Sequence, residues 1–167
     1  MLSEKMAKAL NSQVNAELYS SYFYLAMNSY FESVSLGGFA HWMRYQAQEE
    51  MLHAMKIYDY LHERGGKAEL TVIEQPPQEW HSAGEVFADV LAHEQKVTGL
   101  INDLVDLAMA ERDHAATAFL QWFVTEQVEE EANVGGVVEK LRLIGSDTSG
   151  LFTLDQEMAT RQPPTVE

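Results

Sequence analysis

Apolar residues recur at steps of three and four positions along four long stretches of this chain. In the first stretch, residues 3–31, they are Met6, Leu10, Val14, Leu18, Tyr22 and Leu25. This spacing places side chains on one face of an α-helix, because the helix repeats every 3.6 residues. Further helices are predicted over about residues 39–64, 82–110 and 113–143.

The connections between these stretches differ in length, and this difference predicts the topology. A short break at Gly37-Gly38 separates the first two helices, so we expect them to be antiparallel neighbours. The next connection, residues 67–81, is long and contains Pro76-Pro77, which exclude a helix interior. We therefore expect an all-α fold: an antiparallel four-helix bundle with one long crossover between the second and third helices.

The ends of the predicted helices carry local signals. Ser3 and Ser82 are expected N-caps, and Glu85 completes a capping-box pattern with Ser82. Gly135-Gly136 lies inside the fourth helix and predicts a kink or a close helix contact, since each glycine costs about 1 kcal/mol there. A short fifth helix is expected over about residues 151–160, followed by a flexible segment at 162–167. Residues 1–167 are expected to form a single domain, with the bundle over about residues 3–143.

Several metal-type side chains fall on the apolar faces of these helices. Residues seven apart share a helix face, so a polar residue with apolar neighbours at that offset on both sides points toward the core. Glu50 satisfies this rule between Met43 and Ile57. The rule also selects Glu17, Glu94, Gln127 and Glu130, and His53 lies one turn after Glu50.

Buried carboxylates in this number require compensation, because an isolated buried charge costs several kcal/mol or takes up a proton. Four negative charges match two divalent cations. Carboxylates with one imidazole favour iron, manganese or magnesium, and the chain has no cysteine to offer a softer ligand. A metal-free bundle is the alternative, but its uncompensated charges would cost more than a typical stability of about 5–15 kcal/mol.

The amino-acid composition of the chain limits the kinds of partner that it can bind. The chain has 26 acidic and 11 basic residues and a formal net charge of −15, which disfavours nucleic acid and anionic membranes. No apolar run reaches the roughly 20 residues of a membrane helix, and no signal-peptide pattern opens the chain. We expect no membrane association and a cytoplasmic location.

Four motifs resemble the non-haem ferritins of bacteria and archaea. They are Leu10-Asn11-x-Gln13, Glu17-Leu18-Tyr19-Ser20-Ser21, Gln48-Glu49-Glu50-Met51-x-His53 and the run from Phe119 to Glu131, with Gln127-x-x-Glu130 at its centre. The resemblance covers nearly the whole chain. Ferritin-like di-iron bundles in general carry one Glu on each of two helices and Glu-x-x-His on each of the other two. This chain departs from that template, because its fourth helix offers Gln127-x-x-Glu130 where a second Glu-x-x-His is expected.

The resemblance implies a set of site residues. Glu17, Glu50 and His53 would hold a first iron, and Glu50 would bridge to a second iron held by Glu94 and Glu130. Gln127 would lie close to the second iron and the bound oxygen, and Tyr24 would stand beside the centre as an electron donor. Glu49, Glu126 and Glu129, with Glu130 shared, resemble a third iron site.

The implied function is iron storage with ferroxidase activity. Two Fe(II) ions would bind, O2 or H2O2 would oxidise them, and the Fe(III) product would move to a mineral inside a cage of 24 copies. The missing second histidine fits this interpretation, since a substrate ion must leave whereas a permanent cofactor wants a full ligand set.

Other interpretations remain open at this stage. A rubrerythrin-like peroxidase or oxygenase would keep its metals, and a bacterioferritin would bind haem through a methionine at the position of Met51. The Gln127-x-x-Glu130 motif argues against bacterioferritin, so no haem is expected, and the acidic charge argues against the DNA-protecting ferritin relatives. Without the resemblance, Glu49, Glu126, Glu129 and Glu131 would belong to a solvated helix face, and Tyr24 and Trp122 would be packing residues.

Overall fold

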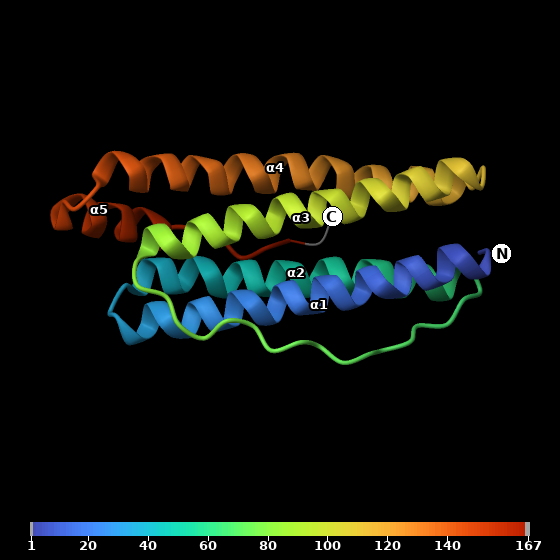
Figure 1. The fold of residues 1–167 in the computed structure, drawn as a ribbon, viewed down its shortest axis with the longest axis horizontal. Coiled ribbons are helices and arrows are strands. Elements are labelled where there is room, and N and C mark those ends of the chain that lie inside the picture. The colour runs from blue at the N-terminus through green and yellow to red at the C-terminus, as the bar shows by residue number, and fades with distance from the viewer. Residues whose placement is uncertain (1, 166–167) are drawn as a thin grey trace.

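A computed structural model describes residues 2–165 of the chain and contains five α-helices there (Figure 1). Their bounds are α1 Glu4–Ser33, α2 Gly37–Glu63, α3 Ala83–Ala110, α4 His114–Ile144 and α5 Thr148–Met158. The first four are long and lie side by side along the long axis of the molecule, and α5 lies at one end. The predicted all-α bundle with a short fifth helix is confirmed. None of the helices in the described range has both the length and the apolar character of a membrane span.

Capping side chains fix where the helices begin. The Ser3 hydroxyl accepts a hydrogen bond from the Met6 backbone N–H at 3.0 Å, and Ser82 accepts one from Glu85 at 3.1 Å. The Glu85 carboxylate accepts the returning bond from the N–H of His81, one residue earlier than in a standard capping box. The fifth helix begins at Thr148, three residues before the prediction, because Asp147 accepts bonds from the N–H groups of Ser149 and Gly150.

The crossover decides the direction of each helix. The α1–α2 and α3–α4 pairs are antiparallel, while the connection from Arg64 to Ser82 returns along α1 and makes α2 and α3 parallel (Figure 1). Side chains of α1 hold this connection in place. Asn11 exchanges two hydrogen bonds with the backbone of Lys67 and Glu69, at 3.0 and 2.6 Å. The predicted long crossover therefore exists and is fastened to the outside of α1.

The core consists of two apolar clusters. One contains Phe31, Phe39 and Phe87, and the other contains Leu10, Ile57 and Ile101. Every one of the four long helices contributes to both clusters, so each helix passes from one cluster to the other near its middle. The residues at that crossing on the four helices are polar and buried.

The fifth helix docks against the start of α2. The Phe39 backbone N–H donates to Asp155 Oδ1 at 2.9 Å, and a Cβ placed on Gly38 would lie only 1.6 Å from the carbonyl oxygen of Asp155. Only glycine permits this close approach. The contact matters for the site, because it places the segment that follows α5 against α2.

One prediction about local packing is wrong, and the close helix contact predicted at Gly135-Gly136 is absent among the described residues. Tyr22 and Leu25 are 50% and 44% exposed, because steps of four residues rotate about 40° beyond a full turn each time and leave the core face. Tyr24 and Met27 are buried there instead. No other part of the described chain comes within 4 Å of a Cβ built on Gly135 or Gly136, and α4 continues through both.

The structure describes only residues 162–165 of the segment that is predicted to be flexible, 162–167. Residues 162–165 line a cavity beside α2 and α4. Residues 166–167 lie outside the described part of the chain.

Candidate metal centre

Six buried polar side chains form the layer between the two apolar clusters. Their exposed fractions lie between 1% and 5%. They are Glu17 from α1, Glu50 and His53 from α2, Glu94 from α3, and Gln127 and Glu130 from α4. We call this set the buried centre. The seven-residue rule thus predicted the inward position of Glu17, Glu50, Glu94, Gln127 and Glu130.

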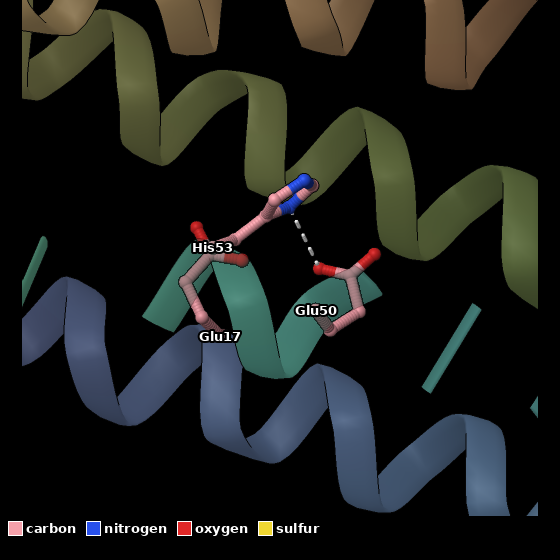
Figure 2. A group of neighbouring side chains, drawn as sticks. All are labelled: Glu17, Glu50 and His53. Atoms are coloured by element: carbon pink, nitrogen blue, oxygen red, sulfur yellow. Dashed lines mark ion pairs between the residues drawn. The ribbon is translucent and has the colours of Figure 1, made fainter. Parts of the chain in front are cut away.

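Glu17, Glu50 and His53 form the tightest part of the buried centre. Each offers one ligand atom, and these atoms all lie within 4.8 Å of one another. Figure 2 shows Glu17 reaching from α1 toward the two residues of α2, with His53 Nδ1 at 3.4 Å from Glu50 Oε2. Oε2 of Glu17 has no hydrogen-bond partner, although such buried polar atoms are normally paired. An unpaired carboxylate oxygen beside two other ligands is a natural position for a cation.

Amide side chains donate hydrogen bonds to several carboxylate oxygens of the buried centre. Gln46 Nε2 donates to Glu50 at 2.9 Å and to Glu130 at 3.0 Å, so one amide joins the carboxylates of α2 and α4. Gln13 Nε2 donates to Glu17 Oε1 at 2.8 Å. These bonds lower the cost of the buried negative charge but leave it without a counter-charge.

Glu94 has its own pair of donors. The Tyr24 hydroxyl donates to Glu94 Oε1, and Gln127 Nε2 donates to Glu94 Oε2 at 3.2 Å. Tyr24 is fully buried, and burial together with the Glu94 carboxylate raises its pKa well above 10. The phenol therefore keeps its proton and remains a hydrogen-bond donor to Glu94.

Burial shifts the acidity of the carboxyl groups strongly. It raises the pKa of Glu17 to about 8, with the nearby Glu50 adding to the effect. Burial and neighbouring carboxylates also raise the pKa of Glu50 and Glu130 well above the usual 4.5, and burial raises that of Glu94. Without a cation the centre therefore holds protons near neutral pH. Divalent ions would replace those protons, because an opposite charge stabilises the ionised form.

A second group of acidic residues lies beside the buried centre. Glu49, His53 and Glu126 offer ligand atoms within 4.8 Å of one another, and Glu49 and Glu126 are half-buried. Glu129 is exposed and lines the same cavity, which has a volume of about 530 Å³. We call Glu49, Glu126 and Glu129 the outer group. His53 contacts both sets and so marks the boundary between them.

Two residues of this region escaped the sequence analysis as contributors to the site. Gln13 and Gln46 each stand four positions before a buried glutamate and donate to it. Because residues four apart meet on a helix face, the repeated Gln-x-x-x-Glu pattern on α1 and α2 was a signal that would have found both. Met51, considered above as a haem ligand, is 42% exposed and lies outside the buried centre.

Comparison with known proteins decides the family. The model of the ferritin-like domain family matches residues 7–144. The chain belongs to the ferritin family. A bacterial non-heme ferritin of Bacteroides fragilis is 46% identical over 161 residues, covering 96% of this chain and 100% of the relative. One from Escherichia coli is 39% identical over 160 residues, covering 96% of this chain and 97% of the relative.

Solved structures agree with this membership of the ferritin family. The open-pore ferritin of the hyperthermophilic archaeon Archaeoglobus fulgidus matches with a TM-score of 0.96 and 54% identity. The match covers 97% of this chain and 100% of that structure. The resemblance inferred from the four motifs is therefore confirmed.

Proposed function

We propose that this protein stores iron and acts as a ferroxidase, oxidising Fe(II) at the buried centre. The observation that carries the proposal is the convergence of ligand atoms from Glu17, Glu50 and His53, together with the unpaired Oε2 of Glu17. A metal-free protein gains nothing from this arrangement, since each buried carboxylate costs several kcal/mol. Membership of the ferritin family supports iron as the metal.

The ligands divide into two positions. Glu17, Glu50 and His53 bind the first Fe(II), and Glu50 bridges to a second held by Glu94 and Glu130. The hydrogen bonds of Gln46 support this division, because they place Glu50 and Glu130 at one amide group. Gln127 lies against Glu94 and so near the second ion. The four carboxylates balance the charge of two divalent ions.

The oxidation needs two electrons for each O2 that leaves as H2O2, and each Fe(II) supplies one. H2O2 is the alternative oxidant. Carboxylates suit this cycle, since they can change between terminal and bridging binding as the iron charge rises. Tyr24 supplies a further electron when O2 is reduced beyond H2O2, and the contact of its hydroxyl with the Glu94 carboxylate supports this role.

The outer group gives a third position for iron. Glu49, Glu126 and Glu129, with Glu130 shared, form this position, and it opens on the 530 Å³ cavity. His53 lies within ligand distance of both sets, which supports passage of an ion from one to the other. Oxidised iron then moves on to the mineral store.

The storage role requires assembly, and we propose a homo-oligomer of 24 copies in the cytoplasm. The surface of the single chain supports assembly, because large apolar side chains are exposed on α1 and on the crossover. They are Tyr22, Leu25, Leu70, Val72 and Ile73. A single domain spanning residues 1–167 is the unit of this assembly.

One experiment tests the proposal directly. The metal-free protein is loaded with Fe(II) under nitrogen, exposed to air, and analysed by size-exclusion chromatography with iron counting. We expect hundreds of irons per particle of several hundred kilodaltons. Retention of only two irons per chain would instead indicate a fixed di-iron cofactor and would refute storage.

A further inference from the structure

The segment that follows α5 returns along α2 and places one cation beside the outer group. The Arg161 guanidinium donates to Gln46 Oε1 at 2.7 Å and pairs with Glu49 Oε2. It also lies over the Trp42 ring, 4.4 Å from its centre. His41 holds the main chain of the same residue, through Nε2 at 2.9 Å from the Arg161 carbonyl oxygen. The position of this guanidinium is thus fixed from several sides.

Arg161 and an ion in the outer group require the same carboxylate. Glu49 is one of the residues whose ligand atoms converge with those of His53 and Glu126, yet its Oε2 is paired with the guanidinium. Like charges at such short range repel, and the pair is only 20% and 21% exposed, so water screens the repulsion weakly. An ion bound by Glu49, His53 and Glu126 therefore competes with Arg161 for the negative charge of Glu49.

The buried centre has no comparable arrangement among the described residues. Its carboxylates receive bonds from neutral amides and a phenol, and Oε2 of Glu17 receives none. A first cation therefore meets carboxylates without a fixed cationic partner in the buried centre, whereas Glu49 is already paired with Arg161. This difference favours filling the buried positions before the third.

We propose that Arg161 is a positioning residue that substitutes for the third ion at Glu49 and leaves when that ion binds. The inference rests on the proposed function. The third position therefore fills after the two buried positions and binds its ion more weakly, because binding there includes the cost of breaking the Arg161–Glu49 pair. The hydrogen bond from Arg161 to Gln46 Oε1 also turns the Gln46 amide nitrogen toward Glu50 and Glu130.

The test is an anaerobic calorimetric titration of the assembled, metal-free protein with Zn2+, which binds without redox chemistry. The wild type should bind two ions per chain tightly and a third more weakly. Arg161→Gln removes the charge but keeps an amide donor for Gln46. It should raise the affinity for the third ion by roughly 2- to 5-fold, the worth of one such pair, and leave the first two unchanged.

Two further variants separate charge from packing. Arg161→Lys keeps the charge and should bind the third ion as the wild type does. Lys140→Gln removes an exposed pair with Glu157 of α5 and should change none of the affinities. A third-ion affinity that is unchanged or lower in Arg161→Gln would overturn the inference.

Crystals of the wild type with and without Zn2+ give a second readout that does not depend on the variants. The guanidinium should leave Glu49 when the third ion is present. An Arg161 that stays on Glu49 beside a bound third ion would refute the proposal. If no ion binds in the buried centre of the wild type, the proposed function itself fails, which is a different result from an unchanged third affinity.

Discussion

The buried centre and the outer group use the same kinds of ligand in different surroundings. Glu17 and Glu50 are almost completely buried, whereas Glu49 and Glu126 are half-buried and Glu129 is exposed. The pKa of Glu17 rises to about 8 through burial, while Glu49 is paired with Arg161. The first set depends on protons or metal ions for compensation. The second set receives it from the protein and from water.

This difference shows that a ligand set is defined by its compensation as much as by its residues. A carboxylate that the protein leaves uncompensated binds a cation strongly and destabilises the chain when the cation is absent. A carboxylate with its own arginine does neither. Variants that remove a carboxylate or change its ligands test this difference between the buried centre and the outer group.

The largest effect is expected from Glu50→Gln compared with Glu49→Gln. Under the proposed function Glu50 is the shared ligand of both buried ions, so its loss should slow rapid Fe(II) oxidation by about 10- to 100-fold, as seen when metal sites lose a supporting group. Glu49→Gln should have a smaller effect, because Glu49 lies outside the pair. Stopped-flow absorbance after mixing with aerobic buffer measures both, and equal rates in the two variants would contradict the division of the site.

The next largest difference between the buried centre and the outer group is expected in the pH dependence of the stability of the metal-free protein. The folded pKa of Glu17, about 8, lies above the ordinary 4.5, so the folded state holds this proton more tightly than the unfolded state. The stability from protonated Glu17 is therefore complete below about pH 4.5 and is lost as the pH rises through 8, by about 1.4 kcal/mol per pH unit. Urea midpoints between pH 5 and 9, at constant protein concentration, measure this loss.

Two variants and one ion serve as controls for that slope. Glu17→Gln should reduce it by about 1.4 kcal/mol per pH unit, with the rest due to Glu50, Glu94 and Glu130. Glu129→Gln should not change it, because Glu129 is exposed to solvent. Saturating Zn2+ should flatten the slope by replacing the protons. A slope that is the same in all three variants and conditions would mean that Glu17 is not the group responsible.

A smaller change is expected when the missing ligand is restored. The double change Gln127→Glu with Glu130→His gives α4 the Glu-x-x-His motif that the general di-iron template contains. The second ion should then dissociate more slowly, by roughly 10-fold, so more iron should remain per chain after dialysis against a chelator. Unchanged iron retention would show that the asymmetry of the ligands does not control release. Gln121→His, on an exposed position of α4, is the matched control.

The smallest effect is expected from a change at Gly135, which lies outside both the buried centre and the outer group. Gly135→Ala should stabilise the chain by about 0.5–1 kcal/mol, because it lowers the entropy of the unfolded state and the added methyl group meets no atom within 4 Å. Fe(II) oxidation should not change. A loss of stability or of the assembled particle would show instead that a second copy contacts this glycine.

Much of this organisation was predictable because it depends on contacts along one helix. The seven-residue rule placed Glu17, Glu50 and Glu94 correctly, since a helix face needs only local sequence. The start of α5 was missed because Asp147, a good N-cap, was not weighed against the apolar run after it. Tyr22 and Leu25 lie off the predicted face because repeated steps of four rotate away from the core.

The remaining features depend on distant residues. Arg161 meets Glu49 across 112 positions, and no periodicity relates them. Gln46 reaches Glu130 across 84 positions, although its bond to Glu50 was open to prediction from their four-residue spacing. The tertiary fold decides such contacts, so a single sequence gives the ligands of the buried centre but not the groups that tune them.

The topology divides the buried centre between two helical hairpins. The α1–α2 hairpin carries Glu17, Glu50 and His53, and the α3–α4 hairpin carries the rest. Each hairpin forms from contacts that are near in sequence, while docking the two halves must bring their carboxylates together late in folding. Protons or divalent ions lower the repulsion at that step. Under the proposed function, iron would aid folding as well as serve as the substrate. We then expect a chain that folds without iron to complete this docking step more slowly as the pH rises.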